Sequence, residues 1–520
     1  MAGALAAILG VTLGPVAGAQ AAPPTPKFEV EEATIASVHA ALAARQITCR
    51  QLVDAYLDRI AAYDKNGPGL NAIIRVNPEA RAEADAQDAR FAKEGLTRPL
   101  DCVPMIVKDN FETQGLATSD GDLAFKDYVP DTDATLVARV KAAGAIVLAK
   151  ANMAEWAFSP VETVSSVLPG YTRNPYDTSR VTAGSSGGTA AAVAASLGLV
   201  GFGSDTGDSI RGPSSHDALV GIRSTMGLTS RAGIFPLSLR ADIGGPMARN
   251  VADAVAVYQV IIGPDPRDPV TARAADHPMP NLARRLDPDG LKGKRIGVLH
   301  EAYDRASLDP EVAALFAAAL DDLRRQGAII VDPAPIEGYT PPSFPPPGQA
   351  CEGFKYDLNA FLAARAGKVP KANLDAIIAS GEFHPSVSER LKAADAAPVN
   401  PPGSPACLAD EARRQALRAE VNKTLTDLKL DALVYPTWSN PPRLIGDLTT
   451  PAGDNNQIFS PFTGFPAIQV PMGYTRGDRL PAGLTFFGPA WSDPELITLA
   501  YAYEQATHHR RPPPSTPPLN

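Results

Sequence analysis

Three polar segments in the first half of the chain contain residue types that nucleophilic acyl chemistry needs. Lys108 directly follows the apolar run Val103–Val107, and two serines, Ser185 and Ser209, each lie in a Gly-containing loop. Burial lowers the pKa of a lysine and can leave a neutral amine that accepts a proton. A serine with an exposed Oγ beside backbone N–H groups can attack a carbonyl carbon and stabilise the resulting oxyanion.

Each segment also has an ordinary structural interpretation. Lys108 could end a strand and extend its ammonium group to solvent. The loop Ala183–Thr189 could be flexible or bind phosphate, although it lacks the Gly-Lys-Thr/Ser ending of a nucleotide-binding loop. The polar turn Gly203–Arg211 could simply end the apolar run before it. The chemistry is therefore indicated by the three segments together and not by any one of them.

The surrounding sequence predicts an α/β fold that would hold these segments at the ends of strands. Thr48 to Gln51 forms a capping box before an amphipathic helix, and Asp133 is expected to cap a helix that ends at Gly144. Asp309 and Pro310 begin another helix. The expected strands are Ala145–Ala149, Arg295–Leu299, Ala328–Val331, Asp431–Pro436 and Ala467–Pro471. Helices alternating with short buried strands predict a large sheet covered by helices on both faces.

From about Val38 to Pro512 the chain resembles the amidase signature family. The shared motifs, besides the three polar segments, are Lys150–Trp156, Thr172–Pro175, Val220–Arg223, Gly227–Arg231, Gly245–Met247, Phe465–Ala467 and Gly483–Pro489. The resemblance implies the amidase-signature fold, with a large mixed β-sheet, and cleavage of an amide carbon–nitrogen bond. It implies no metal and no organic cofactor.

The resemblance also assigns roles to individual residues. Ser209 corresponds to the nucleophile, and Ser185 to a relay serine whose peptide bond with Gly184 is cis in the family. Lys108 corresponds to the base, and Ser186 has no catalytic counterpart. The oxyanion hole corresponds to four backbone N–H groups, those of Thr206, Gly207, Asp208 and Ser209. The chain departs from the family here, since Gly-Gly-Ser is common where this sequence has Gly207-Asp208-Ser209. The Asp208 carboxylate would disfavour an oxyanion unless it points away or pairs with a cation such as Arg211.

The substrate pocket is less well specified by the sequence. We expect Met153, Trp156, Gly184 and His216 to contribute to it. His216 follows the nucleophile closely, but a Ser-His-Asp mechanism would need a Gly-x-Ser-x-Gly elbow, which Ser209 lacks. His216 is therefore interpreted as a structural or pocket residue, and Asp205 as a residue that orders the loop, with Arg211 as its partner.

Changes in composition predict how the domain is organised. Residues 28–512 are expected to form the amidase-signature domain, with N-terminal helices at about 28–75 and the catalytic core at about 76–260. Residues 339–407 are rich in proline and short helices and form either a cap over the site or a surface insertion. Residues 420–512 return to the core. Cys351 and Cys407 could pair in an oxidising compartment, with buried free thiols as the alternative.

Composition also limits the partners and the location. The 520 residues carry a formal net charge of −9 with no basic stripe, so nucleic acid is not an expected partner. Residues 1–21 resemble a secretory signal, with an apolar run and two small-x-small cleavage sites but no preceding lysine or arginine. No other apolar run is long enough to span a membrane. We expect a secreted or periplasmic protein, a monomer or homodimer, that acts on a small-molecule amide.

Three functions from different classes follow. The first is an exported hydrolase of small amides, peptide amides, anilides or carbamates. The second is the glutamine-using subunit of a tRNA-dependent amidotransferase, which would be cytoplasmic and need partner subunits. The third is a non-catalytic scaffold on the same fold, although such relatives tend to lose members of the triad.

Overall fold

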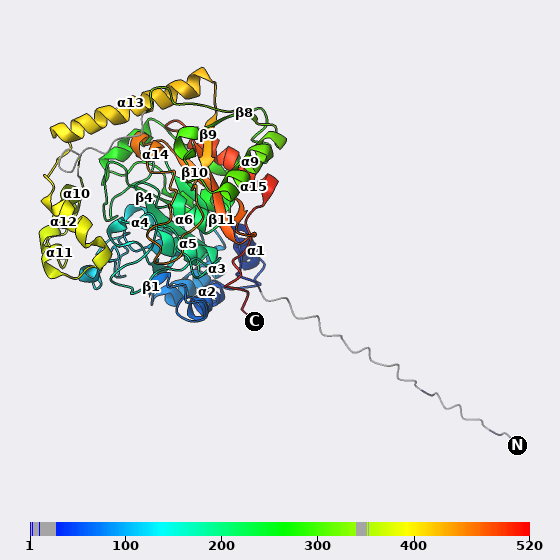
Figure 1. Ribbon diagram of the computed structural model, residues 1–520. Helices are drawn as coiled ribbons and strands as arrows, with labels where there is room; N and C mark the ends of the chain where they lie inside the picture. The colour runs from blue at the N-terminus through cyan, green and yellow to red at the C-terminus, as the bar shows by residue number, and fades with distance from the viewer. Residues whose placement is uncertain (2, 4–9, 11–27, 340–350, 352, 520) are drawn as a thin grey trace.

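A computed structural model describes residues 1, 3, 10, 28–339, 351 and 353–519, and it places one large sheet at the centre of the molecule (Figure 1). The 11 strands lie in the order β1-β3-β2-β4-β6-β5-β10-β11-β9-β7-β8. Their bounds are β1 Ile73–Val76, β2 Pro104–Lys108, β3 Ile146–Ala151, β4 Val200–Asp205, β5 Val220–Arg223, β6 Ile243–Ala248, β7 Arg295–Val298, β8 Ile329–Val331, β9 Ala432–Pro436, β10 Ala467–Thr475 and β11 Leu480–Phe487. The predicted secretory signal, residues 1–21, lies almost entirely outside the described residues.

The sheet is mixed, as expected. β2 pairs in parallel with β3 and β4, and β7 pairs in parallel with β8 and β9, while the strands between these two groups pair antiparallel. The α-helices are α1 Ile35–Ala43, α2 Cys49–Tyr63, α3 Ala80–Glu94, α4 Thr135–Ala142, α5 Gly187–Ala194, α6 Arg211–His216, α7 Val251–Ile261, α8 His300–Tyr303, α9 Pro310–Arg325, α10 Phe354–Ala363, α11 Leu374–Ser380, α12 Ser388–Ala396, α13 Pro405–Asp427, α14 Phe459–Thr463 and α15 Asp493–Thr507.

Helices cover both faces of the sheet, which confirms the predicted α/β class. Consecutive residues of a strand point to opposite faces. In β6, a Cβ added at Gly244 would contact Leu136 of α4, whereas one added at Gly245 would contact Ile210 at the start of α6. α4 and α6 therefore lie on opposite faces. The strands between these layers are buried throughout, so a polar side chain at a strand end is held in a water-poor environment.

The helix starts follow the sequence in two places and depart from it in one. The capping box at Thr48 and the Asp309 cap are both present, and they begin α2 and α9 at the expected residues. Asp133 does not cap α4, because the N-cap is Ala134 and makes no side-chain bond. The Asp133 carboxylate instead accepts hydrogen bonds from the Gln114 N–H and the Lys141 ammonium group, both 2.8 Å away.

The described helices between residues 353 and 407 pack as a group at one side of the molecule, at the left of Figure 1. Leu358 and Leu362 of α10 belong to a buried apolar cluster that also contains Phe125, Trp156 and Phe235 from the first half of the chain. Residues 340–350 and 352, which the sequence assigns to the same Pro-rich insertion, lie outside the described residues.

Two disulfide bonds cross-link the chain. Cys351 and Cys407 are paired, so the first of the two alternatives for these cysteines holds. Cys49 and Cys102 are also paired, which the sequence analysis did not anticipate. The second pair ties the start of α2 to the residues before β2.

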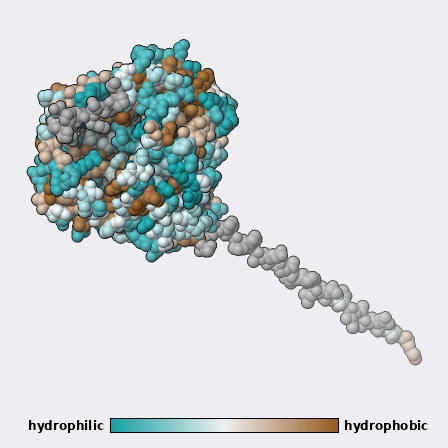
Figure 2. All heavy atoms as spheres, viewed as in Figure 1, coloured by the Kyte–Doolittle hydropathy of each residue, from teal (hydrophilic) through white to brown (hydrophobic). Residues whose placement is uncertain are grey.

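The face of the molecule seen in Figure 2 mixes polar and apolar residues, with no single apolar area dominating it. Among the described residues, no helix combines the length and the apolar character that a membrane span requires.

Candidate active site

Lys108 is the last residue of β2 and is fully buried beneath a loop that contains Ser185. Its Nζ atom lies 2.7 Å from Ser185 Oγ and 2.8 Å from Ser204 Oγ, and both contacts are hydrogen bonds. Burial lowers the pKa of Lys108 to about 7, although Asp120, Asp205 and Asp242 act in the opposite direction. A large share of the side chains therefore carries a neutral amine near pH 7, as a general base requires.

A second buried lysine provides a contrast. Lys150 in β3 donates hydrogen bonds to the Phe111 carbonyl oxygen (2.6 Å) and to Thr118 Oγ1 (2.9 Å), and its Nζ lies 3.6 Å from Asp109. Burial lowers its pKa to about 8. Lys150 thus ties backbone and side chains together, whereas Lys108 contacts the hydroxyl of Ser185.

Ser185 lies in a tightly packed loop just before α5. Its peptide bond with Gly184 is cis, in agreement with what the family resemblance implies. A Cβ added at Gly184 would lie 2.4 Å from the Ser159 carbonyl oxygen and 2.7 Å from that of Glu162, so only glycine fits there. The Ser185 carbonyl oxygen accepts a hydrogen bond from the Ala154 N–H. These contacts fix the Ser185 hydroxyl over Lys108.

Ser209 lies in the turn between β4 and α6 and lines a cavity of about 910 Å³. Its side chain is 5% exposed, and its hydroxyl makes no hydrogen bond to any residue that the structure describes, Ser185 included. Catalytic hydrogen bonds are often long or unformed without substrate and tighten in the complex. Ser209 therefore presents a free hydroxyl to the cavity, as a nucleophile awaiting its substrate requires.

The turn that carries Ser209 offers unused backbone donors. Within the described part of the chain, the N–H groups of Thr206, Gly207, Asp208 and Ser209 donate to no acceptor. The next two N–H groups, of Ile210 and Arg211, point instead to the Asp205 carboxylate. Thr206, Gly207 and Ser209 also line the cavity. This is the arrangement that an oxyanion hole requires.

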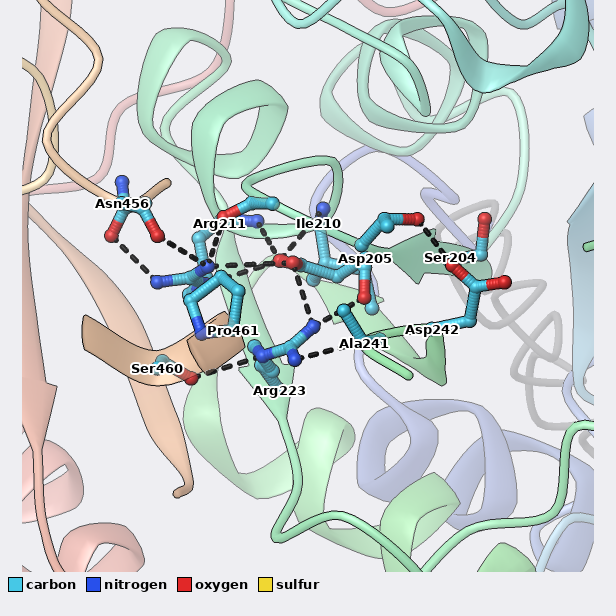
Figure 3. A network of polar contacts seen from close by, with 12 residues as sticks. Ser204, Asp205, Ile210, Arg211, Arg223, Ala241, Asp242, Asn456, Ser460 and Pro461 are labelled. Atoms are coloured by element: carbon cyan, nitrogen blue, oxygen red, sulfur yellow. Dashed lines mark hydrogen bonds and ion pairs between the residues drawn. The ribbon is translucent and has the colours of Figure 1, made fainter. Parts of the chain in front are cut away.

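Asp205 anchors this turn from behind, as Figure 3 shows. Its carboxylate accepts hydrogen bonds from Arg211 Nε at 3.1 Å and from Arg223 Nη1 at 3.0 Å, and all three side chains are fully buried. Burial alone would raise the pKa of Asp205, but the two guanidinium groups outweigh it and lower the pKa to about 2. The predicted pairing of Asp205 with Arg211 is confirmed.

Asp208 takes the first of the two arrangements that the sequence left open, because its side chain points away from the unused N–H groups. Its Oδ2 accepts a hydrogen bond from Trp438 Nε1 at 2.8 Å. The buried guanidinium group of Arg211 forms its ion pair with Asp205 instead.

The four residues expected in the substrate pocket are all buried. Met153 and Gly184 are fully buried, and Trp156 donates its indole N–H to Asp122 at 2.8 Å. His216 packs on the Trp438 ring at 4.6 Å, and burial lowers its pKa to about 3, so it is neutral. None of the four belongs to the residues that line the described cavity. Their contribution to substrate binding stays a prediction.

The cavity wall comes from residues other than these four. Its apolar side chains are contributed by Phe158, Leu237, Phe354 and Phe462, and alanines of α12 add to them. The sequence analysis gave no role to Ser204, although its hydroxyl binds both Lys108 and Asn110. Its position in the strand that ends at Asp205 is visible in the sequence. That β4 lies beside β2, which brings Ser204 to Lys108, is known only from the order of the strands.

Comparisons with known proteins agree on one family. The family model described as Amidase matches residues 51–497. A probable amidase of Arabidopsis thaliana is 33% identical over 94% of this chain and 92% of its own length. The native peptide amidase of Stenotrophomonas maltophilia has a TM-score of 0.82 and 38% identity, covering 93% of this chain and 98% of that one. A glutamyl-tRNA(Gln) amidotransferase subunit from Moorella thermoacetica is 35% identical over 90% of this chain and 96% of its own. The chain belongs to the amidase signature family and is an amidase, a hydrolase that acts on amide carbon–nitrogen bonds.

Proposed function

We propose that the protein hydrolyses its amide through an acyl-enzyme on Ser209, with Ser185 as proton relay and Lys108 as base. The observation that carries this proposal is the 2.7 Å contact between Lys108 Nζ and Ser185 Oγ, made by an amine whose pKa burial lowers to about 7. An ordinary surface lysine, with a pKa of about 10.4, would be charged near pH 7 and unable to accept a proton.

The proposed reaction begins with transfer of two protons. The neutral amine of Lys108 takes the proton of Ser185, which takes the proton of Ser209 as its Oγ bonds to the carbonyl carbon. Backbone N–H groups of the turn stabilise the oxyanion. The proton on Lys108 then returns through Ser185 to the substrate nitrogen, the carbon–nitrogen bond breaks, and the amine leaves. Water, deprotonated by the same route, attacks the ester and releases the acid and Ser209.

We propose peptide amides and other amides with a bulky apolar acyl group as the substrates. The apolar rings of Phe158, Phe354 and Phe462 around the cavity of about 910 Å³ support this, as does the likeness to a peptide amidase. Anilides and carbamates present the same carbonyl and are included in the substrate screen. The cavity is larger than a formamide or acetamide molecule would fill.

A panel of peptide amides, anilides, carbamates, small aliphatic amides and glutamine tests this proposal, with Ser209→Ala as the control. We expect the highest kcat/KM for an amide with an aromatic or branched acyl side chain and no turnover above background in the variant. Enlarging Ala393 of the cavity wall to Trp is expected to raise KM for the bulky amides more than for acetamide. Equal kcat/KM for acetamide and the bulky amides would contradict the substrate proposal.

The similarity to amidotransferase subunits keeps glutamine hydrolysis as a second candidate. Such a protein would release ammonia from glutamine when its partner subunits are added. Turnover of glutamine alone among the substrates tested, and only with partner subunits present, would favour this candidate.

We propose that the chain is exported, as a monomer or homodimer whose residues 28–512 form one catalytic unit. The two disulfides, Cys49–Cys102 and Cys351–Cys407, support this because disulfides persist in oxidising compartments. N-terminal sequencing of protein from the periplasm or the medium tests it, with a new terminus near residue 22 expected. Recovery of the full-length chain in the cytoplasm with reduced cysteines would contradict it.

A further inference from the structure

The side chain of Asp208 makes a buried contact with a distant part of the chain. Asp208 is fully buried, and its Oδ2 lies 2.8 Å from Nε1 of Trp438, which follows β9 and is 3% exposed. The other carboxyl oxygen, Oδ1, has no hydrogen-bond partner among the described residues. The indole N–H is therefore the main polar anchor of this side chain.

α6 leaves room for the contact and supports the indole. A Cβ added at Gly212 would lie 1.9 Å from Asp208 Oδ2 and 2.8 Å from Trp438 Nε1, so any larger residue would force the pair apart. One turn further along α6, the ring of His216 packs on the Trp438 ring at 4.6 Å. His216, a neutral imidazole, thus has a role in holding Trp438.

The contact acts on the turn that carries the four unused N–H groups. Asp205 fixes the N–H groups of Ile210 and Arg211 at the end of this turn. The Asp208 backbone carbonyl oxygen begins α6 by accepting from the Gly212 N–H at 2.8 Å. The hydrogen bond from Trp438 therefore fixes Asp208, the residue immediately before Ser209, within the group of residues whose N–H groups are unused.

We propose that Asp208 is a positioning residue, which aligns the N–H groups of the oxyanion turn through its hydrogen bond to Trp438. The inference rests on the proposed role of Ser209 and adds a residue that acts through the turn without touching the substrate. Donors must be aligned in advance to stabilise an oxyanion, so a small displacement of this turn lowers kcat more than it changes KM.

The carboxyl group is suited to this position because burial favours its neutral form. Burial raises the pKa of Asp208 well above its usual value, and the nearby carboxylates of Asp454 and Asp205 raise it further, while Arg211 and the hydrogen bond from Trp438 act in the opposite direction. The phenol of Tyr435, whose pKa is raised by burial, and the imidazole of His216 on the Trp438 ring are further titratable neighbours. A neutral acid next to the oxyanion turn adds no negative charge to repel the developing oxyanion.

Four single variants and one double variant of the full chain test the inference. Asp208→Ala and Trp438→Phe each remove one partner, Gly212→Ala forces the partners apart, and Asp208→Asn keeps an oxygen acceptor without an ionisable group. We expect kcat to fall roughly 10- to 100-fold in the first three, with KM within about threefold of the wild type. We expect Asp208→Asn to stay within about threefold of wild-type kcat. The Asp208→Ala/Trp438→Phe double variant should have a kcat no lower than that of the less active of its two single variants.

Thermal unfolding of each variant separates positioning from loss of fold. Trp156→Phe, which removes a similar buried indole–carboxyl contact at Asp122, gives the loss of Tm that such a contact alone causes. Wild-type kcat in Asp208→Ala or Trp438→Phe would overturn the inference. So would a kcat in Asp208→Asn as low as that of Asp208→Ala, or additive effects in the double variant.

Ser209→Ala, assayed in the same series, distinguishes this inference from the proposed function. Full turnover in Ser209→Ala would overturn the acyl-enzyme proposal itself. An inactive Ser209→Ala together with a fully active Asp208→Ala would overturn only the role of Asp208.

Discussion

The amine nitrogen of Lys108 lies 2.7 Å from the hydroxyl oxygen of Ser185, at the end of a fully buried strand and beneath a loop of small residues. The contact joins two segments that are far apart in the sequence, because β2 lies beside β4 and the Ser185 loop packs over both. The proposed proton path therefore depends on the sheet order as much as on the motif.

The two neighbouring serines provide a matched pair of variants. Both are fully buried, but Ser185 Oγ contacts Lys108 whereas Ser186 Oγ donates to the Ser204 carbonyl oxygen at 3.3 Å. Each alanine substitution removes one hydrogen bond, which costs about 1 kcal/mol of stability. We expect Ser185→Ala to lower kcat at least roughly a hundredfold and Ser186→Ala less than about tenfold. Steady-state kinetics check this, and equal losses of kcat would contradict the relay role.

The pH dependence of the rate should report the amine of Lys108. Because its neutral form is the base and burial lowers its pKa to about 7, kcat/KM should fall about tenfold per pH unit below that value. Lys108→Met should abolish turnover at every pH, while Lys150→Met, which lacks the contact with Ser185, should retain the acidic limb. A fall of kcat/KM centred near pH 4 in the wild type would argue against Lys108 as the base. So would a Lys108→Met variant that is active and keeps the same acidic limb.

The same pKa shift predicts an effect on stability with a definite sign. The folded chain holds Lys108 with a pKa of about 7, whereas the ordinary value is 10.5. Between these values the unfolded chain binds more protons, so stability rises with pH. Lys108→Met removes the free-energy cost of burying this amine. The Tm of the variant should therefore exceed the wild-type Tm most near pH 7 and least near pH 10.5. Differential scanning calorimetry across this range measures the gap, and a gap that widens with pH would contradict the assignment.

The buried ion pairs of Asp205 should contribute more to the free energy of unfolding than an exposed ion pair of similar length. Asp205→Asn leaves Arg211 and Arg223 without a buried counter-charge, which costs about 3–5 kcal/mol. Asp427→Asn breaks an exposed pair with Lys423, whose charges are screened by solvent, and should cost far less stability. Because the pKa of Asp205 is lowered to about 2, its contribution is complete above pH 3.8 and is lost as pH falls through 2. Urea unfolding at pH 7 compares the two variants, and similar losses would contradict the account.

The two disulfides should differ in what they do for the reaction. They close loops of 53 and 56 residues, so replacing either by two serines costs up to about 4 kcal/mol of stability. Of the four cysteines, Cys351 alone lines the described cavity. We expect Cys351→Ser/Cys407→Ser to raise KM for bulky amides severalfold, whereas Cys49→Ser/Cys102→Ser leaves KM within about twofold. An unchanged KM in the first variant would show that this disulfide does not shape the cavity.

The sequence predicted those parts of the molecule that are encoded locally. The alternation of capped helices and apolar strands was enough for β7, β9 and the start of α9. The polar segments, read together with the family resemblance, selected Lys108, Ser185 and Ser209. Asp133 did not cap its helix, because Gln114 and Lys141 compete for its carboxylate. Competition from a distant segment cannot be seen in the local sequence.

The shape of the cavity wall and the partner of Asp208 were not predicted for the same reason. Phe354 and Phe462 reach the cavity from segments far from Ser209, and neither stands out from ordinary core residues. Trp438 meets Asp208 across a long sequence separation and only because Gly212 leaves room for the contact. Cys49 and Cys102 likewise show no spacing that would indicate a pair.

The most direct test of the acyl-enzyme proposal is to find which residue a fluorophosphonate modifies. The Ser209 oxygen would attack phosphorus and expel fluoride, so a stable phosphonyl adduct should form as activity is lost. Peptide mapping by mass spectrometry should place the adduct on Ser209, with one adduct per chain and none in Ser209→Ala. An adduct on another residue that accompanies loss of activity, or full amide turnover by Ser209→Ala, would contradict the account.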